Sequence, residues 1–326
     1  MNIPDKYKTA YEAGATATIL FVSFFILLVG ANAQSQAGPS RLESLMASEL
    51  SDGAACLFDI IDGVVIASWG EEIWFGEGRP TGSVLKLFTT YALLAAGEPA
   101  TTVFHCPPSS VDVPATESCW YKPGHGNMTL KSALALSCNA YFRQWVAAVD
   151  NTAAERFLIK LGLLESELPD SAEERAGILT GISPEIRPRP VTLIAATAAL
   201  FNGGAVYSIE SLERGTRCAP VKSLPIDARA LSVITAGLRE CAASGTAAAV
   251  QAAVGIEPLL AKTGTATHID GDETDPLRTD GWCLVLFPAE RPKFLLVVFS
   301  PDGSGGGRAA EAAGAIMARF VEEQGR

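Results

Sequence analysis

The first chemically suggestive pair in this chain is Ser83 and Lys86, in the stretch Gly82-Ser83-Val84-Leu85-Lys86. On a helix, a spacing of three places both side chains on one face, one turn apart. A serine hydroxyl becomes a strong nucleophile only when a base takes its proton, and a lysine can do this only as a neutral amine. The pair therefore predicts acyl-transfer chemistry if burial or a second cation lowers the pKa of Lys86. A helix-capping serine beside a solvated lysine is the simpler alternative, because this spacing arises about once by composition in a chain of this length.

Two later motifs favour the chemical interpretation. Ser137-Cys138-Asn139 supplies a second hydroxyl and an amide, and Lys262-Thr263-Gly264-Thr265 supplies a second cation. The order Ser-x-x-Lys, Ser-x-Asn, Lys-Thr-Gly is the signature of penicillin-binding proteins and serine β-lactamases. Two lysines that converge on one dry site repel each other, which favours Lys86 as the neutral base and Lys262 as the cation.

The sequence resembles the transpeptidase domain of the penicillin-binding proteins along almost its whole length after the first residues. Besides the three motifs, the matching stretches are Cys119-Trp120, Gly124-His125-Gly126, Ala140-Tyr141-Phe142, Phe201-Asn202-Gly203-Gly204, Gly245-Thr246-Ala247 and Gly281-Trp282. The resemblance implies an α+β fold with a five-stranded antiparallel sheet flanked by helices and an inserted all-helical subdomain. Ala261 stands where the family usually has glycine, a change that a strand should tolerate.

The same resemblance assigns a role to each motif residue. Ser83 would be the acylated nucleophile and Lys86 its proton acceptor, while Ser137 and Asn139 would relay protons and hold the substrate. Lys262 would supply positive charge and, with Thr263, orient a substrate carboxylate. Gly264 lies on the same substrate-binding strand, and the backbone N–H groups of Ser83 and Thr265 would form the oxyanion hole. No cofactor and no metal are expected for this chemistry.

Hydrophobic periodicity and turn residues predict the elements that position these motifs. Strands are expected at 54–61 and 64–69 around Asp62-Gly63, followed by the serine helix, which Gly97 ends. Helices are expected at 153–161, 191–201, 228–241 and 309–323, and strands at 259–267, 281–287 and 294–300. A further helix from Thr129 runs up to Ser137, whereas residues 99–128 show only turn residues. Sheet strands split by a helical insertion predict an α+β domain whose catalytic site lies where the two parts meet.

Composition restricts the partners. The 326 residues are 48% hydrophobic and carry a net charge of -11. Nucleic acids and anionic membrane surfaces are therefore not expected as partners, because phosphate contacts need clustered lysine and arginine.

The N-terminal region predicts export. Residues 13–40 carry no charge, and the apolar stretch 19–29 follows Lys6 and Lys8 and precedes Ala31-Asn32-Ala33. This layout is typical of a secretory signal peptide, but the uncharged stretch is also long enough for a membrane anchor. We expect residues 1–33 to be one of these, residues 34–52 to be a linker with a helix at 41–50, and residues 53–326 to be the catalytic domain. The domain would be periplasmic or otherwise extracytoplasmic, secreted or held at the membrane.

The seven cysteines loosely fit an oxidising compartment. Cys106 and Cys119 lie in a turn-rich stretch and are the pair expected to form a disulfide. No CxxC or His/Cys spacing suggests zinc. The three histidines, which are far apart in sequence, are interpreted as turn or surface residues.

The function expected is that of a D,D-transpeptidase that cross-links peptidoglycan stem peptides through an acyl-serine and binds β-lactam antibiotics. D,D-carboxypeptidase or β-lactamase activity is the alternative within the same fold, although no motif supplies an obvious base for water. A non-catalytic β-lactam sensor or wall-assembly scaffold is a third hypothesis. Large family members carry further modules beside this domain, so a glycan-synthesising partner protein is also expected.

Overall fold

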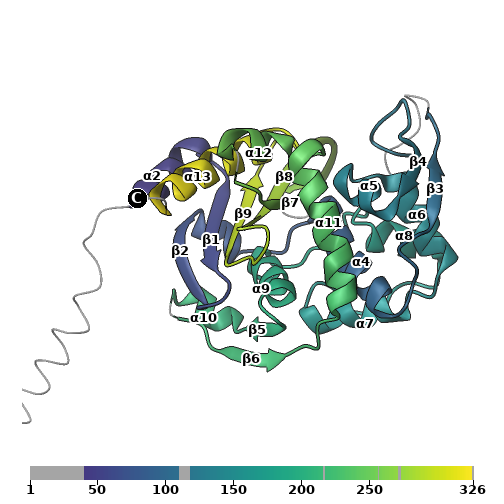
Figure 1. Cartoon of the computed structure of the whole chain (residues 1–326), viewed down its shortest axis with the longest axis horizontal. Helices are drawn as coiled ribbons and strands as arrows, with labels where there is room; N and C mark the ends of the chain where they lie inside the picture. Colours follow the sequence, from purple (N-terminus) through teal and green to yellow (C-terminus); the bar gives the residue numbers. More distant parts are fainter. Residues whose placement is uncertain (1–39, 110–117, 216, 256, 271–272, 325–326) are drawn as a thin grey trace, which may run out of the picture. The chain divides into compact units, whose positions relative to one another are not determined.

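A five-stranded antiparallel sheet lies at the centre of the folded unit Arg41–Arg326 (Figure 1). The computed structural model describes residues 40–109, 118–215, 217–255, 257–270 and 273–324. The strand order is β2-β1-β9-β8-β7, so that β2 and β7 are the edges. The strands are β1 (Ala54–Asp59), β2 (Val64–Trp69), β7 (Leu260–Asp270), β8 (Glu273–Phe287) and β9 (Phe294–Ser300). The predicted α+β class and the five-stranded antiparallel sheet are confirmed.

The first hairpin forms where Asp62-Gly63 predicts it, with a longer turn than expected. The pairing of Asp59 with Val64 leaves residues 60–63 as the connection. Gly63 has a φ of 67°, a left-handed conformation that costs glycine little. Asp59 also stabilises the turn, because its Oδ1 accepts hydrogen bonds from the backbone of Ile61 and Asp62 at 2.9 and 2.8 Å.

Both faces of the sheet are covered, and alternate residues of its central strands enter two separate cores. On β9, Leu296 and Val298 join the core formed with α2 (Arg41–Glu49), α12 (Ala248–Val254) and α13 (Arg308–Gln324). Leu295 and Val297 point to the opposite core, which includes α4 (Leu85–Ala95) and α9 (Pro190–Phe201). The other four strands, covered on both faces, thus support the edge strand β7.

A long insertion between α4 and β7 carries most of the remaining helices, and Figure 1 shows them to the right of the sheet and below it, except for α12 above it. Its helices are α5 (Leu130–Ala135), α6 (Asn139–Ala148), α7 (Thr152–Leu161), α8 (Ala172–Leu179), α9, α10 (Ile209–Glu213), α11 (Ala228–Ser244) and α12. The expectation of an all-helical insertion needs correction, because two hairpins interrupt it: β3–β4 (Val103–Cys106, Gly126–Thr129) and β5–β6 (Ala205–Tyr207, Pro220–Ser223). Short strands of three or four residues give too little alternation to be recognised.

The segment expected as a linker contains α2, which packs on α13 with Leu42 and Met46 buried. The predicted signal peptide or anchor, residues 1–33, lies outside the described residues. Among the described helices, none is both long and apolar enough to cross a bilayer.

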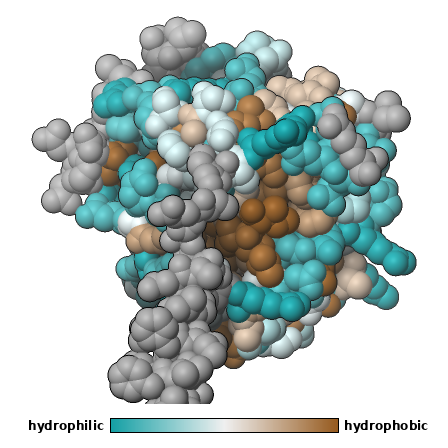
Figure 2. Space-filling view, turned by 90° about the vertical axis from the view of Figure 1, so that its left-hand side faces the viewer, coloured by the Kyte–Doolittle hydropathy of each residue, from teal (hydrophilic) through white to brown (hydrophobic). Residues whose placement is uncertain are grey.

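The edge strand β2 presents apolar side chains to solvent. Val64, Ile66 and Trp69 are 36–37% exposed. Figure 2 views the molecule from the side on which β2 lies in Figure 1 and shows a hydrophobic area framed by hydrophilic residues there. Exposed apolar area of this kind is common in interacting surfaces.

Candidate active site

The predicted nucleophile lies in a tight turn at the start of the serine helix. Gly82–Val84 form one 3₁₀ turn, η2, which leads directly into α4. Gly82 has a φ of 56°, and a Cβ there would lie 2.4 Å from the carbonyl oxygen of Thr265 on β7. Only glycine therefore allows the turn to lie against the edge strand. This contact brings the backbone of Ser83 close to that of Thr265, the two residues predicted to form the oxyanion hole.

Lys86 lies one turn along and points back to Ser83. Its Nζ is 2.6 Å from Ser83 Oγ, 3.0 Å from Asn139 Oδ1 and 2.7 Å from the carbonyl oxygen of Thr180. The amide and carbonyl oxygens can only accept hydrogen bonds. A neutral amine that donates its two hydrogens to them has its lone pair left for the hydroxyl proton of Ser83.

The environment favours that neutral form. Lys86 is fully buried, and no described carboxylate makes a salt bridge with it. Burial lowers its pKa well below the usual value, and the positive charge of Lys262 lowers it further. Lys86 therefore has the electrostatics and the geometry of a general base.

The second motif lies in the connection between α5 and α6. Ser137 has a φ of 53°, an uncommon left-handed conformation for a residue with a side chain. Cys138 precedes the first turn of α6, and Asn139 is the first residue of that helix. The connection thus turns Ser137 toward Lys262 and Asn139 toward Lys86.

Lys262 occupies β7 and is the second buried lysine of the site, 1% exposed. Its Nζ donates to Ser137 Oγ at 3.0 Å and to the carbonyl oxygen of Thr263 at 2.7 Å. Burial lowers the pKa of Lys262 to about 8, so that it is mostly protonated at pH 7. Burial thus lowers the pKa of both lysines, and the positive charge of Lys262 lowers that of Lys86 further.

The rest of the third motif packs closely on the nucleophile turn. A Cβ at Gly264 would lie 2.4 Å from the carbonyl oxygen of Thr81, so that any larger residue would push β7 away from the turn. Thr263 Oγ1 is 2.5 Å from Thr246 Oγ1, and Thr265 Oγ1 accepts from the backbone N–H of Gly305 at 3.1 Å. Thr265 itself is exposed and accessible to a substrate.

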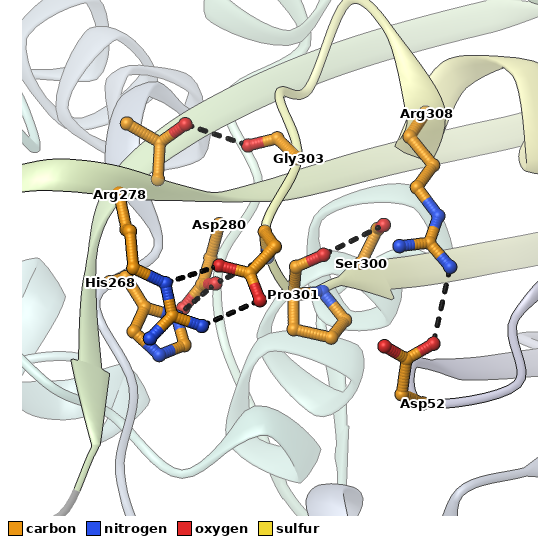
Figure 3. Close-up of polar contacts among 10 residues, drawn as sticks. Asp52, His268, Arg278, Asp280, Ser300, Pro301, Gly303 and Arg308 are labelled. Atoms are coloured by element: carbon orange, nitrogen blue, oxygen red, sulfur yellow. Dashed lines mark hydrogen bonds and ion pairs between the residues drawn. The ribbon is translucent and has the colours of Figure 1, made fainter.

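A polar network holds the far end of β7 to β8 and to the loop after β9 (Figure 3). His268 Nδ1 lies 2.7 Å from Asp280 Oδ1, and both side chains are buried. Asp280 Oδ1 also accepts from the backbone N–H of Asp302 at 3.3 Å, and Asp302 makes two hydrogen bonds of 2.6 Å with Arg278. His268, interpreted from sequence as a turn or surface residue, is therefore a buried structural residue. The network fixes the loop that leads to Gly305, the partner of Thr265.

The structure brings all eight predicted site residues to one place, and it adds two that sequence reasoning missed. Thr180 contributes through its backbone, so its side-chain type carried no signal. Thr246 belongs to the matching stretch Gly245-Thr246-Ala247, but no role followed from the sequence for it. The predicted disulfide is wrong: Cys106 and Cys119 are both free thiols.

Comparison with known families identifies the family. The model of the penicillin-binding protein transpeptidase domain matches residues 74–320, which include all three motifs. This chain belongs to the penicillin-binding protein transpeptidase family. No curated protein matches it significantly.

Solved structures of this family share the fold. The transpeptidase domain of Burkholderia pseudomallei penicillin-binding protein 3 aligns with a TM-score of 0.70 and 16% identity, over 90% of this chain and 98% of that one. Penicillin-binding protein 2 of Helicobacter pylori in complex with MreC aligns with a TM-score of 0.67 and 18% identity, over 87% and 63%. Penicillin-binding protein A of Mycobacterium tuberculosis, as a ceftriaxone acyl-enzyme, gives 0.64 and 18%, over 86% and 78%. At these identities the likeness concerns the fold alone.

Proposed function

We propose that this protein is a serine D,D-transpeptidase that cross-links peptidoglycan stem peptides ending in D-alanyl-D-alanine. One observation carries the proposal: the buried Lys86 Nζ lies 2.6 Å from Ser83 Oγ, and its other two contacts are oxygens that can only accept hydrogen bonds. This arrangement activates a serine without a histidine or a carboxylate.

In the acylation step, Ser83 Oγ attacks the carbonyl carbon of the penultimate D-alanine while Lys86 takes the hydroxyl proton. The backbone N–H groups of Ser83 and Thr265 would stabilise the oxyanion. When the C–N bond breaks, the amine of the terminal D-alanine leaves with a proton relayed through Ser137. An ester between Ser83 and the stem peptide remains.

Recognition of the terminal carboxylate fits the third motif. Lys262 supplies a buried positive charge, and the Thr263 and Thr265 hydroxyls lie along the same strand. A carboxylate can then accept charge-assisted hydrogen bonds, which are stronger than neutral ones. Benzylpenicillin carries a carboxylate as well and would bind in the same orientation.

The fate of the ester separates a transferase from a hydrolase. In the second step a stem-peptide amine attacks the ester, Ser83 Oγ regains a proton and the cross-link forms. Hydrolysis of a trapped drug would need a base beside the attacking water. Among the side chains that the structure describes, no carboxylate hydrogen-bonds to Ser83, Lys86, Asn139 or Lys262, which favours slow hydrolysis.

Intact-mass measurement after incubation with benzylpenicillin tests this function. We expect one acyl adduct on wild type that persists for many minutes, no adduct on Ser83→Ala, and an unchanged adduct on the control Ser48→Ala, which alters an exposed serine of α2. Labelling that persists in Ser83→Ala would refute the nucleophile. Loss of the adduct within seconds, with drug consumed in large excess, would show a β-lactamase.

A donor thioester ending in D-alanine distinguishes transfer from carboxypeptidase activity. Wild type should form the amide product when an amine acceptor is added. Release of free acid at the same rate with and without the amine would instead show a D,D-carboxypeptidase.

We also propose that the domain acts outside the cytoplasm beside a glycan-synthesising partner. The complex of the Helicobacter pylori relative with MreC supports a partnered mode of action for this fold. A reporter enzyme active only after export, fused behind residue 40, tests the location. Crosslinking of the full chain in its own cells, followed by mass spectrometry, tests the partner; recovery of no glycan-polymerising protein would contradict it.

A further inference from the structure

A second cluster of chemically reactive side chains lies beside the active site. It consists of Cys106, Cys119, His125 and Cys138, whose potential ligand atoms all lie within 4.8 Å of one another. The three thiols are buried and His125 is partly buried. Cys106 ends β3 and Cys138 precedes α6, while the other two lie between β3 and β4. In Figure 1 this region is the right-hand end of the molecule, where β3 and β4 lie next to α6.

The distances within the cluster are those of a tetrahedral metal site. Zn²⁺ bonds of about 2.3 Å to sulfur and about 2.0–2.1 Å to nitrogen at tetrahedral angles place two sulfurs about 3.8 Å apart and a sulfur and a nitrogen about 3.6 Å apart. Cys119 Sγ lies 3.9 Å from Cys138 Sγ. His125 Nδ1 lies 3.5 Å from Cys106 Sγ and 3.4 Å from Cys119 Sγ. Three edges of the expected tetrahedron are therefore already present.

The donor set selects the metal. Thiolate and imidazole are soft or borderline ligands, and three cysteines with one histidine are a common set for structural zinc. Calcium and magnesium need oxygen ligands, and the cluster offers none. A disulfide accounts for the cluster less well, because joining any two sulfurs leaves a buried thiol and an imidazole without a common role.

The surroundings hold the imidazole in a fixed orientation. Trp120 and Tyr121 pack their rings against His125, with centroids 5.5 and 4.9 Å away. Trp120 Nε1 also donates to the carbonyl oxygen of Leu136 at 3.0 Å, one residue before the second motif. Gly124, with a φ of 77°, lies so close to the end of β3 that a Cβ would be 2.7 Å from the carbonyl oxygen of Cys106. The conformation of the loop thus directs the His125 Nδ1 atom toward the sulfurs.

We propose that Cys106, Cys119, His125 and Cys138 bind one structural Zn²⁺ ion that holds the β3–β4 hairpin to the second catalytic motif. Four protein ligands complete the tetrahedron, so the ion has no open position for substrate. Binding requires the three thiols to lose their protons, which are released to solvent.

The link to catalysis runs through Cys138, which stands between the two motif residues. Ser137 contacts Lys262 and adopts the left-handed φ of 53°, and Asn139 contacts Lys86. The hairpin itself contacts α6, because Tyr141 Oη donates to the carbonyl oxygen of Thr102 at 3.0 Å and Gln144 Nε2 to that of His105 at 2.9 Å. The four ligands are thus positioning residues: a metal bond to Cys138 would restrain the backbone that aims both polar side chains.

Metal analysis of the full chain tests the proposal. Protein produced in zinc-supplemented medium and purified without chelators should contain one equivalent of zinc by elemental mass spectrometry. Cobalt exchanged into the site should show thiolate-to-metal charge-transfer absorption and the intense visible bands of a tetrahedral ion. Cys106→Ala and Cys119→Ala should bind zinc more weakly by at least the roughly 10–100-fold that loss of an outer-sphere partner costs. Cys56→Ala, which removes a buried thiol of β1, is the matched control and should keep the full equivalent.

Cys138 is left unchanged in this series because its neighbours belong to the catalytic site. A wild-type protein that binds no zinc or cobalt after reduction would overturn the proposal. So would equal zinc contents in the ligand variants and Cys56→Ala, or a disulfide between cluster cysteines in zinc-replete protein. These measurements do not depend on turnover, so they stand or fall separately from the proposed transpeptidase function.

A kinetic readout tests the positioning role. Removing zinc should slow acylation of Ser83 by benzylpenicillin by up to about 100-fold, the cost of a misplacement of about 1 Å. Adding zinc back should restore the rate in wild type and Cys56→Ala but not in Cys106→Ala. An acylation rate that does not change on zinc removal would refute the link between the ion and the second motif.

Discussion

Replacing Lys262 by methionine is expected to stabilise the fold at neutral pH while it removes activity. The buried ammonium costs free energy of folding, because burial lowers its pKa from 10.5 to about 8. At about 1.36 kcal/mol per pKa unit, this shift destabilises the native state by about 3 kcal/mol at pH 7. Methionine has a similar length and carries no charge, so it avoids this cost.

The pH dependence follows from the sign of the shift. A lysine whose pKa is lower in the folded state binds fewer protons there than in the unfolded state, so native stability rises with pH. The destabilisation caused by Lys262 is largest well below pH 8 and disappears above pH 10.5. At pH 9.5 this destabilisation is about 1 kcal/mol, so it falls by about 2 kcal/mol between pH 7 and pH 9.5.

The loss of two hydrogen bonds offsets part of this gain in stability. Ser137 Oγ and the carbonyl oxygen of Thr263 lose a donor in Lys262→Met, at about 1 kcal/mol each. The variant should therefore be about 1 kcal/mol more stable than wild type at pH 7 and slightly less stable at pH 9.5.

Urea unfolding of both proteins at the two pH values measures this change of sign. Lys222→Met, which alters an exposed lysine of β6, is the control for removing a lysine charge without burial. If the difference between Lys262→Met and wild type stays constant with pH, the reasoning about the buried cation is wrong.

Three further predictions concern the catalytic geometry. Lys86→Met should slow acylation by benzylpenicillin by about 10²–10⁴-fold, the usual contribution of a general base, as followed by intact mass; a rate near wild type would exclude Lys86 as the base. Gly264→Ala should lower stability by about 1–3 kcal/mol and suppress acylation, because the new Cβ would lie 2.4 Å from a fixed carbonyl oxygen. Gly177→Ala is its control, since a Cβ there meets only one atom, 3.9 Å away, and thermal unfolding should separate the two variants. Finally, the acylation rate of wild type should fall above about pH 8 as Lys262 loses its proton, and at low pH as Lys86 gains one. A wild-type acylation rate that stays constant up to pH 9.5 would contradict the role of the Lys262 charge.

The sequence predicts most of the fold because its elements are long and strongly patterned. The helix 228–241 with its cap Asp227 is observed as α11, with Asp227 Oδ1 accepting from the backbone N–H of Ala230 at 2.8 Å. The strand expected at 294–300 is β9 with the same bounds. By contrast, the β3–β4 hairpin was not predicted, since its strands have four residues each and lie in a turn-rich stretch.

The parts of the site that could not be predicted depend on contacts between residues that are far apart in the sequence. The motif residues were recognisable because a helix or a strand fixes their local spacing, as for Ser83 and Lys86. Thr180 was not, because a backbone carbonyl leaves no trace in residue type. The cysteine cluster was missed for a related reason: its ligands come from separate elements, so no short spacing of the CxxC kind marks it.

The energetics of the two lysines show why the proposed catalytic residues need such a scaffold. Each buried amine disfavours folding, and the left-handed conformation of Ser137 adds backbone strain. The fold can tolerate these free-energy costs only where packing is complete on every side. Here that place lies between the edge strand β7, the serine helix α4 and the start of α6. The same burial supports the proposed chemistry, because a solvated Lys86 would hold its proton and could not take one from Ser83. Loosening any of the three elements should therefore let water reach Lys86 and raise its pKa toward the ordinary value, so that variants of this kind lose acylation together with packing.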